Sequence, residues 1–290
     1  MEYLYLFIVI FSVYIQNILV KQYNTKVKHE NSNIIFIFAK VLVATIFLGV
    51  MFLFNPIFLW TTFFFALAFA CSFAICVYSS FMAIRTGPLS LTALISSFSI
   101  MLPSLYSVIF LGESFTKLSV IGFVLLCVSL VLINKVDKNK KINIKWLFFA
   151  LTCFLTNGIS SILQKVHQEN LKAEGLVPND YTVAFQFLAM IAVTAVFGVV
   201  LLIKLPKNAG KKFKNGLVYT APSGVANAIC NLLMLVLATM LPGVVLYPSV
   251  SAGGIVFTFI TALFFYKERY TKWQYVGYGC GIISVVLLSL

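Results

Sequence analysis

The sequence predicts an all-α integral membrane protein with ten transmembrane helices, arranged as two inverted five-helix repeats. Three observations lead to this fold class. First, 61% of the 290 residues are hydrophobic and only 10% are charged, which leaves too little polar surface to cover a soluble globule of this size. Second, ten apolar stretches are each long enough to cross a hydrocarbon core of about 30 Å. Third, similar segments recur half a chain apart.

The ten apolar stretches are predicted as helices because each contains a window of about 20 residues with few polar side chains. The segments between them are too short to form a soluble domain. The predicted helices span residues 3–23, 34–54, 57–84, 89–111, 116–134, 146–165, 181–203, 216–240, 243–266 and 271–290.

The two halves of the chain read as diverged copies of one unit. Glu113 followed by Gly122 in the first half matches Glu268 followed by Gly277 in the second. Each copy holds five helices, and five is odd, so the second copy must lie upside down relative to the first, as in many secondary transporters. The predicted organisation is a first repeat at 1–135, a basic linker at 136–145 and a second repeat at 146–290.

The charge distribution predicts the orientation. A formal net charge of +13 would suggest nucleic acid as a partner of a soluble protein, but here the Lys and Arg residues lie at helix ends and in loops. Most of them fall in one set of loops, which the positive-inside rule places in the cytoplasm. We therefore expect a multi-pass protein of the cell membrane with both termini outside the cytoplasm. Its expected partners are the lipid bilayer and a small-molecule substrate, with no nucleic acid.

The sequence contains no pattern typical of an enzyme. Its six cysteines fall within predicted helices without a CxxC pair, so they are interpreted as packing residues. His29 and His167 lie at or beyond predicted helix ends and are interpreted as solvated loop residues. There is no Gly-rich phosphate loop, Walker sequence or nucleophile elbow. We expect no catalytic residue, no metal and no cofactor.

The repeated pattern resembles the drug/metabolite transporter superfamily, EamA type, over the whole chain. In that pattern a span ends in Gly-Glu, and a short turn leads to a helix with a further Gly. Glu113 and Gly122 carry the resemblance in the first half; the second half keeps Glu268 and Gly277 but has Lys267 in place of the first Gly. The resemblance implies two interlocked bundles around one central cavity, lined by the first four helices of each half.

The fifth helix of each half is predicted to pack rather than to bind substrate. Glycines in these helices allow a close helix approach. Each glutamate precedes such a helix, where a carboxylate favours the N-terminus and pairs with Lys117 or Lys272; the alternative is a gating role. Structural roles are thus expected for Glu113, Glu268, Gly122, Gly277 and Gly281.

Polar side chains at mid-depth in the helices are the candidate substrate contacts, because an amide or hydroxyl without a partner in hydrocarbon costs free energy. Asn227 and Asn231, for example, are four residues apart and share one helix face. The alternatives are that such groups bridge neighbouring helices and that Lys40 snorkels to the surface. The candidates are Gln16, Asn17, Lys40, Tyr78, Ser96, Asn157, Gln186, Asn227, Asn231, Tyr247 and Ser251.

The charges inside the helices favour one class of substrate. No Asp or Glu lies deep in a predicted helix, which argues against a proton-driven carrier of lipophilic cations. An amide-rich site without carboxylates suits a neutral or zwitterionic solute, such as an amino acid. The leading hypothesis is therefore a secondary-type transporter that moves a small polar metabolite by alternating access between the two repeats.

Prolines supply the helix irregularities that hinges use, and hinges or gates are expected at Pro88, Pro103, Pro242 and Pro248. Internal duplication supplies both halves of the pathway, so a monomer is sufficient for transport. Three alternatives remain: a carrier of phosphorylated or nucleotide-sugar-like anions that relies on Lys40, a lipid-linked-sugar flippase, and a membrane scaffold or sensor that transports nothing.

Overall fold

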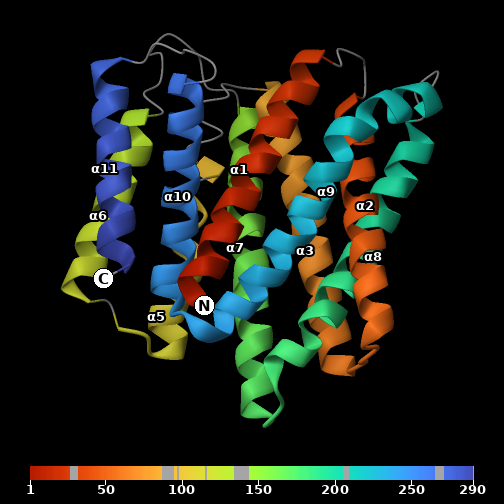
Figure 1. Cartoon of the computed structure of the whole chain (residues 1–290), viewed down its shortest axis with the longest axis horizontal. Helices are drawn as coiled ribbons and strands as arrows, with labels where there is room; N and C mark the ends of the chain where they lie inside the picture. Colours follow the sequence, from red (N-terminus) through yellow and green to blue (C-terminus); the bar gives the residue numbers. More distant parts are fainter. Residues whose placement is uncertain are drawn as a thin grey trace. The chain divides into compact units, whose positions relative to one another are not determined.

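The computed structural model describes residues 1–26, 32–86, 95–96, 98–114, 116–133, 144–204, 209–264 and 271–289. Within these ranges the protein consists of ten α-helices and one short 3-10 helix, without strands (Figure 1). The elements are α1 (Glu2–Lys26), α2 (Ser32–Phe54), α3 (Trp60–Thr86), α5 (Met101–Leu111), α6 (Lys117–Ile133), α7 (Ile144–Ala173), η1 (Pro178–Tyr181), α8 (Thr182–Ile203), α9 (Ala209–Met240), α10 (Gly243–Phe264) and α11 (Lys272–Ser289).

The chain is a multi-pass membrane protein by the length and composition of its helices. Large apolar side chains such as Phe64, Val199 and Val218 are exposed along them, as expected where lipid rather than water surrounds a helix. Six stretches of the described residues are long and apolar enough to cross a bilayer: Glu2–Val20, Ile34–Phe54, Trp60–Ser80, Ile144–Ala173, Pro178–Ile203 and Gly216–Met240. The arrangement of ten spans in two repeats stays a prediction.

Contacts between residues divide the chain into two compact units. Unit 1 comprises Met1–Ala74 and Val166–Thr239, and unit 2 comprises Ile75–Lys165 and Met240–Leu290. Each unit therefore combines segments from the first and the second half of the sequence, and α3 and α7 contribute residues to both units.

In unit 1, α2 packs along α8. The hydroxyl oxygens of Thr45 and Thr194 are 2.8 Å apart, and the rings of Phe52 and Phe187 stack with their centroids 5.1 Å apart. On another side of α2, Gly224 of α9 brings the two backbones close together. A Cβ atom at Gly224 would lie only 2.5 Å from the Lys40 carbonyl oxygen, so this contact requires glycine.

Replacing Gly224 by valine is expected to remove most of the folded protein from the membrane. The added side chain would collide with the α2 backbone, which cannot rotate away as a flexible side chain does. The amount of monodisperse protein after detergent extraction measures the effect. Gly279→Val is the matched control, because a Cβ atom at Gly279 meets nothing within 4 Å among the described residues. Equal yields of the two variants would contradict the prediction.

In unit 2, α6 packs along α11, and α10 packs against α5, α6 and α11 (Figure 1). The Ser284 hydroxyl donates a 2.8 Å hydrogen bond to the Gly122 carbonyl oxygen and so joins α11 to α6. Gly122 is buried on α6, and Gly277 and Gly281 are buried on α11. A small-residue surface of this kind lets two apolar helices approach closely.

Helix α7 is longer than predicted. The sequence predicted a helix that ends at 165 and a loop at 166–180, but α7 continues to Ala173. The added residues favour a helix, and Lys172 pairs with Glu169 at 3.0 Å within it. The helix ends just before Gly175, whose φ of 74° favours glycine. His167 is consequently fully buried, and its interpretation as a solvated loop residue is wrong.

Other boundaries differ from the prediction by a few residues, and two differences are larger. Helix α9 begins at Ala209 rather than at 216, and the predicted helix at 89–111 is interrupted by a turn at 99–100. Pro103 lies in the first turn of α5, where its missing N–H group is tolerated. Pro242 directly precedes α10, and Pro248 lies inside it. Pro88 falls outside the described residues, so of the four predicted hinges only three can be placed.

Candidate functional site

The predicted substrate contacts divide between the two units. Six of them lie in unit 1 and five lie in unit 2. Hydrogen bonds join four of the unit 1 members directly, whereas in unit 2 Ser99 and Cys153 lie between Asn157 and Ser96. The unit 1 members are Gln16, Asn17, Lys40, Gln186, Asn227 and Asn231, and the unit 2 members are Tyr78, Ser96, Asn157, Tyr247 and Ser251.

Hydrogen bonds link four residues with amide side chains in unit 1, and we call Gln16, Gln186, Asn227 and Asn231 the amide cluster. Asn227 Nδ2 donates a 3.1 Å hydrogen bond to Gln16 Oε1, which joins α9 to α1. Gln186 Nε2 donates to the Asn231 carbonyl oxygen at 3.3 Å, which joins α8 to α9. Asn231 Nδ2 donates to the Asn227 carbonyl oxygen one turn earlier, at 2.9 Å. The consecutive helices α8 and α9 and the distant helix α1 therefore carry amides that these hydrogen bonds link.

The amide cluster retains unused hydrogen-bonding capacity. Gln186 is fully buried and Asn227 is only 6% exposed. Gln186 Oε1, Asn227 Oδ1 and the hydroxyl of Ser223, one turn before Asn227, have no hydrogen-bond partner among the described residues. A buried polar atom without a partner costs about 1–3 kcal/mol. A donor group on a bound solute would offset that cost, so these oxygens are suited to contact a substrate.

Lys40 lies beside α9 in the same unit. Its side chain is partly buried on α2, and its backbone lies against Gly224 of α9. Lys40 therefore lies beside the helix that carries two members of the amide cluster. Asn17, in contrast, is exposed on α1 next to Gln16.

A second polar group forms around Asn157 in unit 2, and we call Cys76, Ser96, Ser99, Cys153 and Asn157 the Asn157 group. Asn157 Nδ2 donates to the Ser99 hydroxyl at 2.5 Å, and the Cys76 thiol donates to Asn157 Oδ1 at 3.7 Å. The Ser96 hydroxyl lies 3.5 Å from Cys153 Sγ. The group connects α3, α7 and the turn before α5. Sequence reasoning missed its cysteines because it treated them as packing residues.

The remaining candidates of unit 2 lie apart from the Asn157 group. Tyr247 is buried on α10, and its hydroxyl donates a 3.0 Å hydrogen bond to the Ser161 carbonyl oxygen. Tyr78 is 43% exposed and packs edge-on against Phe149. Ser251 is half-buried on α10. Of these three, only Tyr247 joins two helices through a hydrogen bond in the described part of the chain.

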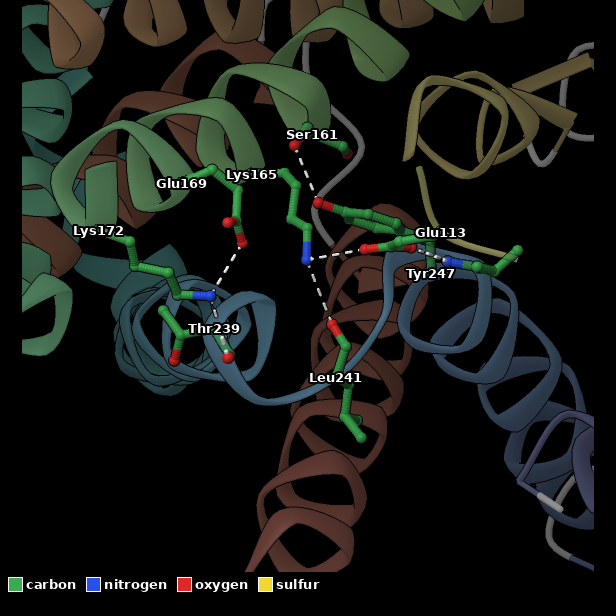
Figure 2. A network of polar contacts seen from close by, with 9 residues as sticks. Glu113, Ser161, Lys165, Glu169, Lys172, Thr239, Leu241 and Tyr247 are labelled. Atoms are coloured by element: carbon green, nitrogen blue, oxygen red, sulfur yellow. Dashed lines mark hydrogen bonds and ion pairs between the residues drawn. The ribbon is translucent and has the colours of Figure 1, made fainter. Parts of the chain in front are cut away.

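An ion pair holds the start of α10 (Figure 2). Lys165 Nζ lies 3.2 Å from Glu113 Oε1, with side chains only 5% and 16% exposed. Lys165 also donates to the Leu241 carbonyl oxygen at 3.4 Å, and the Val244 N–H group donates to Glu113 Oε2 at 3.3 Å. A carboxylate at a helix N-terminus satisfies an otherwise free N–H group. The pair therefore connects α7, the turn after α5 and α10.

The ion pair differs from the predicted pairing of Glu113 with Lys117. Helix α5 ends at Leu111, and the cap residue Gly112, whose φ is 68°, turns the chain. The Glu113 N–H group then bonds back to the Ser107 carbonyl oxygen at 3.2 Å, as in a helix cap. This turn directs the carboxylate to the N-terminus of α10 instead of to the helix that follows in sequence. Glu268, the predicted counterpart, lies outside the described residues.

A second lysine binds the end of a helix in unit 1. Lys172 Nζ donates to Glu169 Oε1 at 3.0 Å and to the Thr239 carbonyl oxygen at 3.4 Å, near the C-terminus of α9 (Figure 2). Both side chains of this pair are about one-third exposed or more. A cation near a helix C-terminus is favourable, but an exposed pair contributes little to stability.

His167 is a polar residue whose burial was not predicted from the sequence. Its Nε2 atom lies 3.0 Å from the Thr62 hydroxyl oxygen, and its ring packs against Phe185 and Phe65 with centroid distances of 4.6 and 5.6 Å. The Nδ1 atom has no hydrogen-bond partner among the described residues. These contacts join α3, α7 and α8 within unit 1.

A profile of the family described as "Sugar transport protein" matches residues 18–290. The chain belongs to the sugar transport protein family. This membership confirms the prediction of a membrane transporter, whereas the narrower resemblance to EamA-type transporters stays a prediction. No curated protein sequence matches this member of the family.

Solved structures support the fold of this sugar transport family member. One crystal structure, described only as that of a protein, covers 99% of the chain and 98% of its own chain with a TM-score of 0.69. The sequence identity is 13%, so the likeness concerns the fold alone.

Proposed function

We propose that this protein carries a neutral sugar, or a chemically similar polyhydroxylated solute, across the membrane. The observation that carries the proposal is the amide cluster, in which buried amide oxygens remain without partners in the described structure. Membership of the sugar transport protein family supports the same substrate class. The specific sugar is left to experiment.

Amide side chains suit a sugar because each offers two donors and an acceptor, and a sugar hydroxyl both donates and accepts. The segments that build this region, 3–26, 32–54, 182–203 and 209–240, contain no Asp or Glu. A zwitterionic amino acid would leave its ammonium group without a carboxylate partner here, although Lys40 offers a partner to its carboxylate. A neutral solute avoids this unpaired charge.

The transport mechanism that we propose is alternating access between two inverted repeats, as in the EamA-type transporters that the chain resembles. The repeated Gly–Glu pattern supports the inverted arrangement. The proposed hinges are the prolines near helix ends, Pro103 and Pro242, together with Pro248 inside α10 and Pro88. Both termini lie outside the cytoplasm in this proposal, as the loop charges predict.

A thermal-shift panel tests the substrate class. The purified protein in detergent is heated with neutral monosaccharides, amino acids or sugar phosphates, each in excess. A ligand that binds only the folded state adds about 2.7 kcal/mol at a hundredfold excess over its Kd. We expect stabilisation by at least one neutral sugar and no stabilisation by amino acids. Stabilisation by amino acids alone would restore the zwitterion hypothesis.

Replacing Lys40 by glutamine separates the sugar proposal from the anion alternative, which the position of Lys40 beside α9 favours. Glutamine keeps a polar side chain and removes the charge. For a neutral sugar we expect uptake by reconstituted liposomes within about threefold of the unmodified protein, because no ionic contact to the substrate is lost. Loss of uptake, together with stabilisation of the unmodified protein by sugar phosphates, would indicate an anion carrier.

A further inference from the structure

Two thiols meet between helices in unit 2. Cys76 Sγ of α3 and Cys153 Sγ of α7 are 3.9 Å apart, and the Cys76 thiol also lies 3.8 Å from the Cys153 carbonyl oxygen. The two side chains are 8% and 2% exposed. Cys127 and Cys280, the other cysteines of this unit, make no sulfur–sulfur contact within its described residues.

We propose that Cys76 and Cys153 form an oxidation site at which a disulfide bond joins α3 to α7 and lowers transport. The oxidant is a peroxide. In the first step one sulfur attacks a peroxide oxygen, which gives a sulfenic acid and one molecule of water from hydrogen peroxide. In the second step the other thiol attacks the sulfenic sulfur, the S–S bond forms, and a second molecule of water leaves. Two thiols are thereby oxidised while one peroxide is reduced.

Formation of the bond brings the two sulfurs closer together. The sulfurs must approach from 3.9 Å to a bond length of about 2.05 Å. Hydrogen peroxide is small and uncharged, so it can reach a thiol that a large maleimide reagent cannot. Because the pair is intramolecular, a mixed disulfide with a second thiol compound is not needed.

The bond would disturb the Asn157 group. Before oxidation the Cys76 thiol donates to Asn157 Oδ1, and Cys153 Sγ contacts the Ser96 hydroxyl. The disulfide has no S–H donor, so the Asn157 contact is lost and both sulfurs move toward each other. Asn157 and Ser96 are proposed substrate contacts. The expected loss of transport therefore rests on the proposed function, whereas the cross-link itself does not.

Peptide mass spectrometry tests the cross-link. The protein in liposomes is treated with hydrogen peroxide, its free thiols are alkylated, and its peptides are analysed. We expect a linked peptide pair containing Cys76 and Cys153 that disappears after dithiothreitol. The variants Cys76→Ser and Cys153→Ser should form no such pair. Cys71→Ser is the matched control, because Cys71 is exposed on the same helix, and it should cross-link like the unmodified protein.

Sugar uptake by the same liposomes tests the consequence. Peroxide is expected to reduce uptake, because the Cys76 contact to Asn157 is lost and Cys153 Sγ shifts relative to Ser96, and dithiothreitol should restore it. Each serine variant, compared with its own untreated activity, should no longer respond. Absence of the linked peptide overturns the oxidation site, and a complete cross-link with unchanged uptake overturns its effect on transport. If no form takes up sugar, the proposed function fails while the peptide result still decides the site.

Discussion

Replacing Asn227 by alanine is expected to reduce sugar transport by about 10- to 100-fold without reducing the amount of protein in the membrane. The variant removes the 3.1 Å hydrogen bond from Asn227 Nδ2 to Gln16. It also removes Asn227 Oδ1, which has no hydrogen-bond partner among the described residues. Loss of such a buried contact costs about 1–3 kcal/mol, and each 1.4 kcal/mol is a factor of ten in binding. Initial uptake rates at several sugar concentrations measure the effect.

The control for this prediction is Asn179→Ala, which removes an exposed asparagine from η1 of the same unit. Its uptake should match that of the unmodified protein. A second comparison uses Gln16→Ala and the double variant. If the two residues act through their contact, the double variant should lose less transport than the sum of the two separate losses. If Asn227→Ala lowered membrane abundance and transport in parallel, Asn227 would be a structural residue and the amide cluster would not be a binding site.

Replacing Lys165 by methionine is expected to destabilise the protein by about 3–5 kcal/mol, because it leaves the Glu113 carboxylate buried without its cation. The Lys165 and Glu113 side chains are 5% and 16% exposed and lie 3.2 Å apart. Lys165 also binds the Leu241 carbonyl oxygen before α10. The midpoint of thermal unfolding and the yield of monodisperse protein measure the loss.

Lys172→Met provides the control, since Lys172 forms a comparable ion pair with Glu169 whose side chains are 40% and 32% exposed. An exposed pair contributes at most about 1 kcal/mol, so this variant should unfold near the temperature of the unmodified protein. The double variant Glu113→Gln/Lys165→Met should recover part of the stability lost by Lys165→Met. If Lys165→Met were as stable as Lys172→Met but transported poorly, the pair would act as a gate.

Much of the fold follows from composition and hydropathy. The apolar stretches predicted the helices of the described chain because in lipid every backbone polar group must be satisfied within the segment, which only helices and closed barrels achieve. Hydropathy windows predicted helices shorter than α7 and α9, since a helix can continue past its apolar stretch. Residues 166–173 are polar yet helical because they favour a helix and because Glu169 pairs with Lys172.

Part of the candidate site was also predictable. The four-residue spacing of Asn227 and Asn231 indicated one helix face, and the need of buried amides for partners indicated that others would join them. The sequence named Gln16 and Gln186 among the candidates but did not show which helices would meet. The pairing of Glu113 with Lys165 could not be read from spacing, because it depends on the turn at Gly112 and on the packing of α7 against the start of α10.

The candidate residues alone did not determine the substrate class. Amides without carboxylates favoured a neutral or zwitterionic solute and did not distinguish a sugar from an amino acid. The family match points to sugars. The contact between Cys76 and Cys153 could not be predicted either. A cysteine on an apolar helix is interpreted as a packing residue until its neighbour on another helix is known.

Uptake of a labelled neutral monosaccharide by liposomes that contain the purified protein tests the central claim most directly. The panel of sugars is measured with and without an excess of unlabelled amino acids or sugar phosphates. We expect accumulation of at least one sugar, competition by the same unlabelled sugar alone, and loss of uptake in Asn227→Ala. Uptake of an amino acid or a phosphorylated compound, together with no uptake of any sugar, would contradict the account.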